Sequence, residues 1–387
     1  MKQGWEIKKL GDVCTIERGG SPRPIDAYIT DKDNGINWIK IGDATPNSKY
    51  ITSTKEKIKP EGIRKSRMVY KGDFILSNSM SFGRPYILGV DGCIHDGWLV
   101  LRDNENTFDK IFLYYYLSSP FIYQEFKRLA VGGVVNNLNS ELVRGVNVIV
   151  PPIAEQEKIV AELDCLSGII EKKKQQLKEL DNLAQSIFYE MFGDPVENDK
   201  GWEKKRLDEI GKVITGNTPS TKDESNYSSA DYCFVKPSDI AKDSISYISN
   251  TEFYVSEKAY INSRQLPKGS VLTTCIGIIG KVGILQKDAT CNQQINAIIP
   301  NKDIDAKFLA HVLFMIRDVL TDVANAPIVP IINKKEFSSV SIPVPLFSLQ
   351  QDFASKIESI EKQKELIAKA IKETETLFNS RMDYYFN

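Results

Sequence analysis

The chain has 387 residues, of which 42% are hydrophobic and 26% are charged, and its formal net charge is −1. These values are typical of a globular protein that buries a real core. The chain has no apolar run long enough to span a bilayer and no signal sequence, which argues against a membrane partner and favours a cytoplasmic location. The six cysteines are scattered, and the two histidines, His95 and His311, lie far apart, so we predict no metal site.

The first part of the chain, residues 1–150, is predicted to be a mixed α+β domain. It opens on Gly-Trp-Glu at residues 4–6. A helical stretch at 108–129 precedes its last loop and strand. Short runs rich in β-branched and aromatic residues, separated by Gly, Pro, Asn and Asp, predict strands at residues 37–41, 73–77, 98–102 and 146–150.

The second part, residues 151–193, is predicted to be one long helix entered through Pro-Pro-Ile-Ala-Glu-Gln at 151–156. Apolar residues recur with a seven-residue period, which is the pattern of a coiled coil. An ordinary amphipathic helix packed on a globular body is the alternative, but so long a stripe favours an equally long partner helix. The interface positions are Ile159, Leu163, Leu166, Ile170, Leu177 and Leu180.

The third part, residues 194–342, repeats the first. It opens on Gly-Trp-Glu at 201–203, and an offset of about 197 residues relates many of its positions to the first part. A helical stretch is expected at 306–324. Strands are expected at residues 232–235, 270–276, 295–299 and 340–344.

The fourth part, residues 343–387, repeats the long helix at an offset of 194 residues. Because the third part follows closely on the first helix, the second helix must run back antiparallel to bury its stripe, which relates the halves by a pseudo-two-fold axis. Lys173 and Lys364 interrupt the two stripes. They either fix the register or extend their ammonium groups to water, and we favour the second interpretation. The interface positions are Phe353, Ile357, Ile360, Ile367, Ile371 and Phe378.

The sequence predicts no catalytic residues. Motifs of a cofactor-binding and catalytic methyltransferase site are missing, and the glycine-rich stretch 277–283 lacks the spacing of a phosphate loop. Glu56, Glu61 and Asp73 lie near lysines, as in some nuclease sites, but have no counterpart in the third part. Two alternatives stay open: a stand-alone sequence-specific nuclease or methyltransferase, and a coiled-coil adaptor with no DNA role.

Binding of double-stranded DNA is the function that the remaining features favour. Residues 49–71 contain eight basic residues against two glutamates, which suits phosphate contacts, although a solvated charge run is an equal alternative. Polar loop residues suit contacts with base edges, although any one of them is more often part of a turn. The candidates of the first part are Arg18, Ser21, Arg23, Lys40, Lys55, Lys57, Arg64, Lys65, Arg67, Asn78, Arg84, Asn136 and Asn137. Those of the third part are Asn217, Thr218, Lys222, Lys236, Thr274, Lys281, Asn292, Gln293 and Asn333.

This arrangement resembles the specificity subunit of type I restriction–modification enzymes over essentially the whole chain. The matching features are the two Gly-Trp-Glu openings, Lys-Gly-Asp-Phe at 71–74 with Lys-Gly-Ser-Val at 268–271, and the two Pro…Gln helix entries at 151–156 and 345–350. The second entry has Leu346 where the family often has a second proline.

The resemblance implies a non-catalytic subunit with two target recognition domains, each reading one half of a bipartite DNA site. The helices would set the gap and dock two methyltransferase subunits, and restriction subunits could join. The assembled complex would be an adenine-N6 DNA methyltransferase and a type I site-specific endonuclease. The resemblance implies no cofactor in this chain, since S-adenosylmethionine, Mg²⁺ and ATP are expected on the partner subunits.

Overall fold

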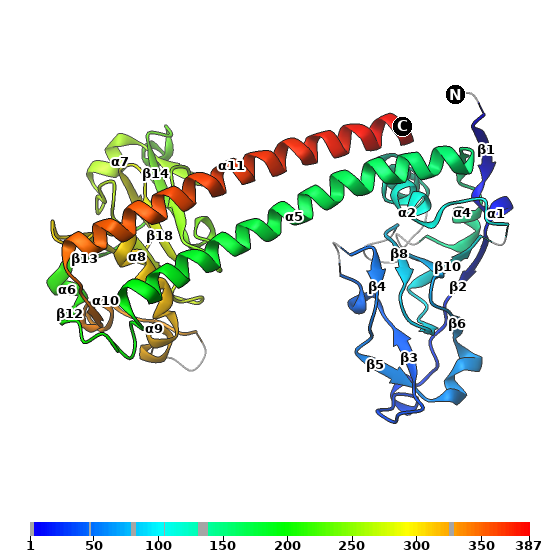
Figure 1. Ribbon diagram of the computed structural model, residues 1–387, viewed down its shortest axis with the longest axis horizontal. Helices are drawn as coiled ribbons and strands as arrows, with labels where there is room; N and C mark the ends of the chain where they lie inside the picture. Colours follow the sequence, from blue (N-terminus) through cyan, green and yellow to red (C-terminus); the bar gives the residue numbers. More distant parts are fainter. Residues whose placement is uncertain (1–3, 46–47, 79–82, 104, 131–137, 325–328) are drawn as a thin grey trace. The chain divides into compact units, whose positions relative to one another are not determined.

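The computed structural model describes residues 4–45, 48–78, 83–103, 105–130, 138–324 and 329–387 (Figure 1). The chain divides into two compact units. Unit 1 comprises Met1–Lys172 with Ala370–Asn387, and unit 2 comprises Lys173–Lys369. None of the helices in the described ranges has the length and apolarity needed to cross a membrane.

The described residues of unit 1 form three sheets, which confirms a mixed α and β domain. Its five-stranded sheet is antiparallel except for the parallel pair β4–β8 and has the order β2 (Thr15–Arg18), β10 (Trp98–Arg102), β7 (Phe74–Ser77), β8 (Pro85–Leu88), β4 (Tyr50–Ile51). A four-stranded sheet has the order β5 (Glu56–Ile58), β3 (Ile36–Ile39), β9 (Gly92–Ile94), β6 (Arg67–Val69). The third sheet pairs β1 (Glu6–Lys9) with β11 (Asn147–Val150).

The helical stretch predicted at 108–129 forms two helices rather than one. Ser119 separates them with an extended backbone, φ −65° and ψ 146°. This is the conformation that a residue before proline prefers, and Pro120 begins the second helix. The helices of unit 1 outside the long pair are α1 (Leu10–Val13), α2 (Lys110–Ser118), α3 (Pro120–Ala130) and α4 (Ser140–Arg144), with 3₁₀ helices η1 (Ile25–Ala27), η2 (Ile41–Asp43) and η3 (Pro60–Lys65).

Unit 2 repeats this architecture, as the sequence repeat predicts. Its five-stranded sheet has the order β13 (Gly211–Thr215), β20 (Ile295–Pro300), β17 (Val271–Thr274), β18 (Val282–Leu285), β15 (Ser246–Ile248). A three-stranded sheet has the order β16 (Phe253–Val255), β14 (Tyr232–Val235), β19 (Ala289–Cys291), and β12 (Lys204–Arg206) pairs with β21 (Ser341–Pro343). The stretch predicted at 306–324 is again two helices. The helices are α6 (Leu207–Ile210), α7 (Glu257–Ile261), α8 (Ala306–Met315), α9 (Arg317–Val323) and α10 (Lys334–Ser339), with η4 (Glu224–Tyr227) and η5 (Pro237–Asp239).

Two 40-residue helices, α5 (Ile153–Phe192) and α11 (Phe347–Phe386), follow the two domains. In unit 2 the two helices pack antiparallel. Asp181 of α5 pairs with Lys364 of α11, whereas Phe188, closer to the C-terminus of α5, contacts Phe353, closer to the N-terminus of α11. The phenylalanine rings belong to the core of unit 2. The long paired helices therefore form where the heptad pattern predicts them.

All the predicted interface positions of α5 and α11 are at least partly buried. The buried positions are Ile159, Leu163, Ile170, Phe353, Ile357, Ile360 and Ile371. The half-buried positions are Leu166, Leu177, Leu180, Ile367 and Phe378. Each unit therefore extends its domain core onto the helices, since Ile159 and Leu163 join the core of unit 1 and Ile357 and Ile360 join that of unit 2.

Lys364 corrects the interpretation in which its ammonium group reaches water. Its side chain is 17% exposed, and Nζ pairs with Asp181 at 2.7 Å and Glu361 at 2.9 Å. Burial by itself lowers the pKa of Lys364, but the hydrogen bonds to the two carboxylates outweigh it, so the pKa is raised. The lysine is therefore a charged member of the interface between the helices.

Candidate nucleic-acid interface

In unit 1, loops that are distant in sequence meet at one end of the strands of the five-stranded sheet, where β2 and β7 end and β10 begins. Gly20 donates from its backbone nitrogen to the carbonyl oxygen of Ile94 at 3.1 Å, and Ser66 donates from Oγ to the same oxygen at 3.1 Å. His95 donates from its backbone nitrogen to Ile39. We call residues 18–23, 38–41, 64–67 and 95–97 loop edge 1.

Unit 2 has the same construction, with Gly216 where unit 1 has Gly19. The backbone nitrogen of Gly19 donates to Trp98, and that of Gly216 to Ile295. A Cβ atom at Gly19 would collide with the carbonyl oxygen of His95, and one at Gly216 with that of Asn292. Glycine is needed there because two backbones pass so close to each other. We call residues 215–218, 264, 275–281 and 292–294 loop edge 2.

The exposed basic residues of unit 1 lie partly at loop edge 1. Arg64 belongs to it and is exposed. Lys55, between β4 and β5, is also exposed, and its backbone nitrogen donates to the Asp43 carboxylate of η2 at 3.1 Å. Lys57 is half-buried on β5, and Arg84 is exposed. These cations carry positive charge without a partner carboxylate within ion-pair distance among the described residues, which suits contacts with phosphates.

Other basic candidates of unit 1 have partners inside the unit. Lys40 pairs with Glu56, and Arg67 pairs with Glu17 at 3.0 Å. Lys65 donates from Nζ to the Tyr28 hydroxyl at 2.7 Å. Lys49, from the same basic stretch, contacts Asp164 on α5 and therefore stabilises the packing of the domain on the helix.

Polar candidates differ in how much of their hydrogen-bonding capacity the fold uses. Asn333 caps α10, since its Oδ1 accepts from the Glu336 nitrogen at 3.0 Å. Thr274 is buried and donates to Ile278, and Lys281 donates from Nζ to Pro237 at 2.9 Å. Lys236 lies 3.1 Å above the Phe253 ring centre.

The amide side chains in and beside the two loop edges also use much of their hydrogen-bonding capacity within the fold. Asn78 is buried and donates to the Asp96 carbonyl at 3.0 Å. Asn292 is buried and donates to Gln294 at 2.9 Å. Asn217 accepts from the Arg264 nitrogen at 2.9 Å. Lys222 is exposed beyond loop edge 2. Asn136 and Asn137 lie outside the described residues.

Sequence reasoning missed Asp96, which lies at the centre of loop edge 1. Its carboxylate accepts from Ser21 Oγ at 2.7 Å and lies 3.8 Å from Arg23 Nη2, and its carbonyl oxygen accepts from Arg18 Nε at 3.0 Å. An open hollow of about 650 Å³ is lined by Ser21, Arg23 and Asp96 together with Trp38 and His95. The signal in the sequence was the 197-residue offset between Asp96 and the candidate Gln293.

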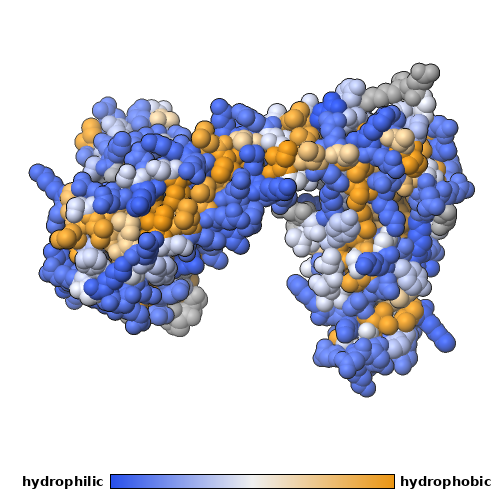
Figure 2. Space-filling view, in the orientation of Figure 1, coloured by the Kyte–Doolittle hydropathy of each residue, from blue (hydrophilic) through white to orange (hydrophobic). Residues whose placement is uncertain are grey.

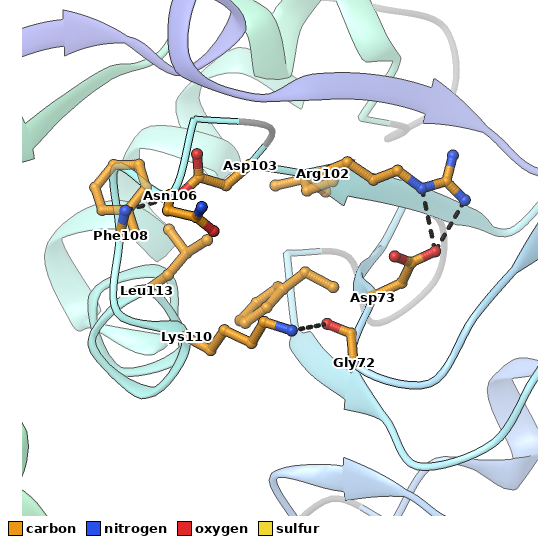
Figure 3. A pocket seen from close by; sticks show the side chains of 10 residues that line it. Gly72, Asp73, Arg102, Asp103, Asn106, Phe108, Lys110 and Leu113 are labelled. Atoms are coloured by element: carbon orange, nitrogen blue, oxygen red, sulfur yellow. Dashed lines mark hydrogen bonds and ion pairs between the residues drawn. The ribbon is translucent and has the colours of Figure 1, made fainter.

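A second hollow of unit 1 lies at the opposite end of the same strands, where β7 begins and β10 ends (Figure 3). There Arg102 donates to Asp73 Oδ2 from Nε at 3.1 Å and from Nη2 at 2.8 Å, and Lys110 donates to the Gly72 carbonyl oxygen at 3.1 Å. Because Asp73 forms this ion pair with Arg102, we interpret it as a structural residue. Glu56 pairs with Lys40 instead, and no contact joins Glu56 to Asp73 in the part of the chain that the structure describes, so these two carboxylates form no nuclease-like cluster.

Apolar side chains remain at the surface of the long helices (Figure 2). In unit 2 the exposed positions include Leu183, Tyr189, Phe347 and Leu366, of which Leu366 is 69% exposed. In unit 1 they include Ile153, Ile169, Leu377 and Tyr384. Exposed apolar residues along a helix are typical of surfaces that bind other proteins.

The fold and its loop edges define a duplicated α+β binding domain, each copy followed by a long helix. The family of the type I restriction modification DNA specificity domain matches residues 2–182 and again 199–376. The chain belongs to this family, and it is a DNA sequence-specificity subunit of the type I restriction–modification class with two recognition domains.

Two of the curated relatives are similar over nearly their full length, and a third over less than half of it. The HindI specificity subunit of Haemophilus influenzae is 23% identical, covering 92% of this chain and 93% of that protein. The putative MjaX specificity subunit of Methanocaldococcus jannaschii is 24% identical, covering 96% and 91%. The MjaIX specificity subunit of the same organism is 32% identical over a shorter stretch, 44% of this chain and 42% of that protein.

Solved structures show the same fold. A chain from a structure of the type I R-M system, described for complex assembly and conformational transition, has a TM-score of 0.64 at 20% identity, covering 100% of this chain and 98% of that one. The type I S subunit from M. genitalium has a TM-score of 0.56 at 13% identity, covering 98% and 95%.

Proposed function

We propose that each recognition domain binds one half of a bipartite duplex site through its loop edge. The observation that carries the proposal is the repetition of one backbone frame with unlike side chains at the two loop edges, as expected for two domains that share a fold and read different sequences. Exposed cations such as Lys55 and Arg64 supply sequence-independent affinity for phosphates.

The long helices act as the spacer that sets the gap between the half-sites, as the fixed geometry of dimeric DNA-binding proteins sets half-site spacing. Their exposed apolar residues dock two methyltransferase subunits, one for each repeat. Restriction subunits join the same assembly. The assembly acts on DNA in the cytoplasm.

Chemistry belongs to the partner subunits in this proposal. S-adenosylmethionine, Mg²⁺ and ATP bind there, and this chain contributes recognition and spacing without catalytic residues. The assembled complex methylates adenine at N6 and, with restriction subunits, cleaves DNA.

Mapping N6-methyladenine across the genome with and without this gene tests the proposal. Methylation at one bipartite motif should disappear with the gene. A second strain, with one heptad inserted into both α5 and α11 at facing positions, should methylate the same half-sites at a longer gap. Unchanged methylation in the deletion strain overturns the specificity role, and an unchanged gap in the insertion strain overturns the spacer role.

A further inference from the structure

The two loop edges contain one matching pair of side chains. Ser21 Oγ donates to Asp96 Oδ1 at 2.7 Å in unit 1, and Thr218 Oγ1 donates to Gln293 Oε1 at 2.7 Å in unit 2. Thr218 lies 197 residues after Ser21, and Gln293 lies 197 residues after Asp96. The same offset relates Gly216 to Gly19, the two glycines at the close backbone approach. The pairs therefore occupy equivalent positions, but one acceptor is a carboxylate and the other a carboxamide.

The main chain beneath each acceptor is fixed by hydrogen bonds. The carbonyl oxygen of Asp96 accepts from Arg18 Nε and from Asn78 Nδ2, both at 3.0 Å. Next to Gln293, the buried Asn292 donates from its backbone nitrogen to Val235 at 3.1 Å. The side-chain tips remain open to solvent, since the Asp96 side chain is 44% exposed and Gln293 is exposed. Such a supported but open side chain is suited to precise contact with a ligand.

The two tips have different hydrogen-bonding capacity. The hydroxyl of Ser21 holds the pKa of Asp96 below its usual value, so the group is ionised at neutral pH and only accepts hydrogen bonds. Gln293 can donate as well as accept. Its amide nitrogen makes no hydrogen bond with the described residues, and its oxygen keeps one lone pair beside the bond from Thr218.

We propose that Asp96 and Gln293 are the equivalent base-contacting side chains of the two recognition domains. Asp96 accepts a hydrogen bond from an exocyclic amino group in the major groove, cytosine N4 or adenine N6, and Gln293 forms paired bonds with adenine N6 and N7. The proposal rests on the proposed function above. Ser21 and Thr218 are positioning residues, because they orient the acceptor without contacting the base.

The negative charge of Asp96 disfavours bases that present only acceptors, as well as favouring bases that present an amino group. Guanine offers N7 and O6 and thymine offers O4 in the major groove, and all three atoms are acceptors that a carboxylate repels. The neighbouring Arg18 and Arg23 offset the repulsion between this carboxylate and the DNA phosphates, because both guanidinium groups lie on the same loop edge.

Selection from a random duplex library tests the assignment, with the full-length chain assembled with its methyltransferase subunits. The isosteric substitution Asp96→Asn adds a donor, so guanine or thymine should enter at one position of one half-site, with discrimination there reduced roughly tenfold to a hundredfold. Gln293→Ala should abolish the adenine preference at one position of the other half-site. The base that the wild type selects at the Asp96 position distinguishes adenine from cytosine.

Two control variants separate base contact from general effects. Asp33→Asn removes the same charge from an exposed site before β3, and Gln286→Ala removes a carboxamide beyond the far end of β18. Both should leave every base preference unchanged. Ser21→Ala should weaken discrimination at the Asp96 position and at no other.

The failures of the two proposals are distinguishable. If Asp96→Asn and Gln293→Ala retain all wild-type preferences, the assignment of these side chains is wrong while the recognition function stands. If the wild-type complex enriches no sequence at all, the recognition function itself is wrong.

Discussion

The side-chain oxygen of Gln156 accepts a hydrogen bond from the backbone nitrogen of Asp109 at 2.7 Å, although 47 residues separate them. Gln156 is completely buried, and its Nε2 donates to the carbonyl oxygen of Pro151 at 2.8 Å. The Asp109 carboxylate in turn caps α2. Gln350 binds Asp305 and Pro345 in the same way in unit 2. The Pro…Gln entry therefore joins each long helix to the helix of the domain before it.

Replacing Gln156 by leucine should lower the free energy of unfolding by about 1–3 kcal/mol, because buried backbone groups lose their partners. Gln350→Leu should act similarly. Urea unfolding followed by circular dichroism measures both. The matched control is Gln176→Leu on the exposed face of α5, which should change stability by less than about 0.5 kcal/mol. Equal effects of Gln156→Leu and Gln176→Leu would contradict the role of this hydrogen bond.

The ion pair between Asp181 and Lys364 should be coupled energetically. Lys364→Met leaves Asp181 and Glu361 partly buried without their cation, so we expect a loss of about 1–3 kcal/mol after allowing for partial exposure. Asp181→Leu combined with Lys364→Met should cost less than the sum of the two single changes. A double-mutant cycle by urea unfolding measures the coupling, and strictly additive losses would show that the pair contributes nothing.

His311 should make the stability of unit 2 depend on pH. Burial lowers the pKa of His311 from 6.5 to about 4, since the charged imidazolium is disfavoured beside α5 and α11. As pH falls from about 6.5 to about 4, the unfolded chain takes up a proton that the folded chain does not bind. The free energy of unfolding should therefore decrease through this window, by about 3 kcal/mol from this group.

The contribution of His311 is isolated by comparison with His311→Phe. Both proteins share their carboxylates, so the difference between their unfolding free energies should change with pH between 6.5 and 4.5, measured by urea unfolding at several pH values. A constant difference across that range would mean that His311 does not titrate differently in the two states.

Lys55 and Arg64 should contribute to DNA affinity without affecting sequence preference. Each phosphate contact removed should reduce the slope of log affinity against log salt concentration by about 0.9. Fluorescence anisotropy with a cognate and a random duplex over a salt series measures this for Lys55→Ala and Arg64→Ala. Lys158→Ala on α5, whose side chain is 72% exposed and pairs with Glu155, is the control and should leave the slope unchanged. Unchanged slopes in the first two variants would place the phosphate-binding surface elsewhere.

Several features of this protein could be predicted from sequence because they are local or repeated. The heptad positions from Ile159 to Leu180 and from Phe353 to Phe378 follow from helical periodicity alone. The duplicated openings at 4–6 and 201–203 predicted two similar domains, and the five-stranded sheets of the two units do have equivalent strand orders. The break at Ser119 was missed although Pro120 follows it, and the break at Ile316 has no proline or glycine beside it to mark it.

The candidate site depended on contacts between distant segments. No sequence pattern around Asp96 marks it as a binding residue. It lies beside Ser21 because the loop after β2 passes the connection between β9 and β10, 75 residues later in the chain. In the same way, nothing near Lys364 in the sequence indicates that Asp181 is its partner. The amino-acid order determined the helices, the repeat and the family, since those patterns are written along the chain. Tertiary structure alone decided which polar side chains meet, because hydrogen bonds and ion pairs depend on distances in space that sequence separation does not report.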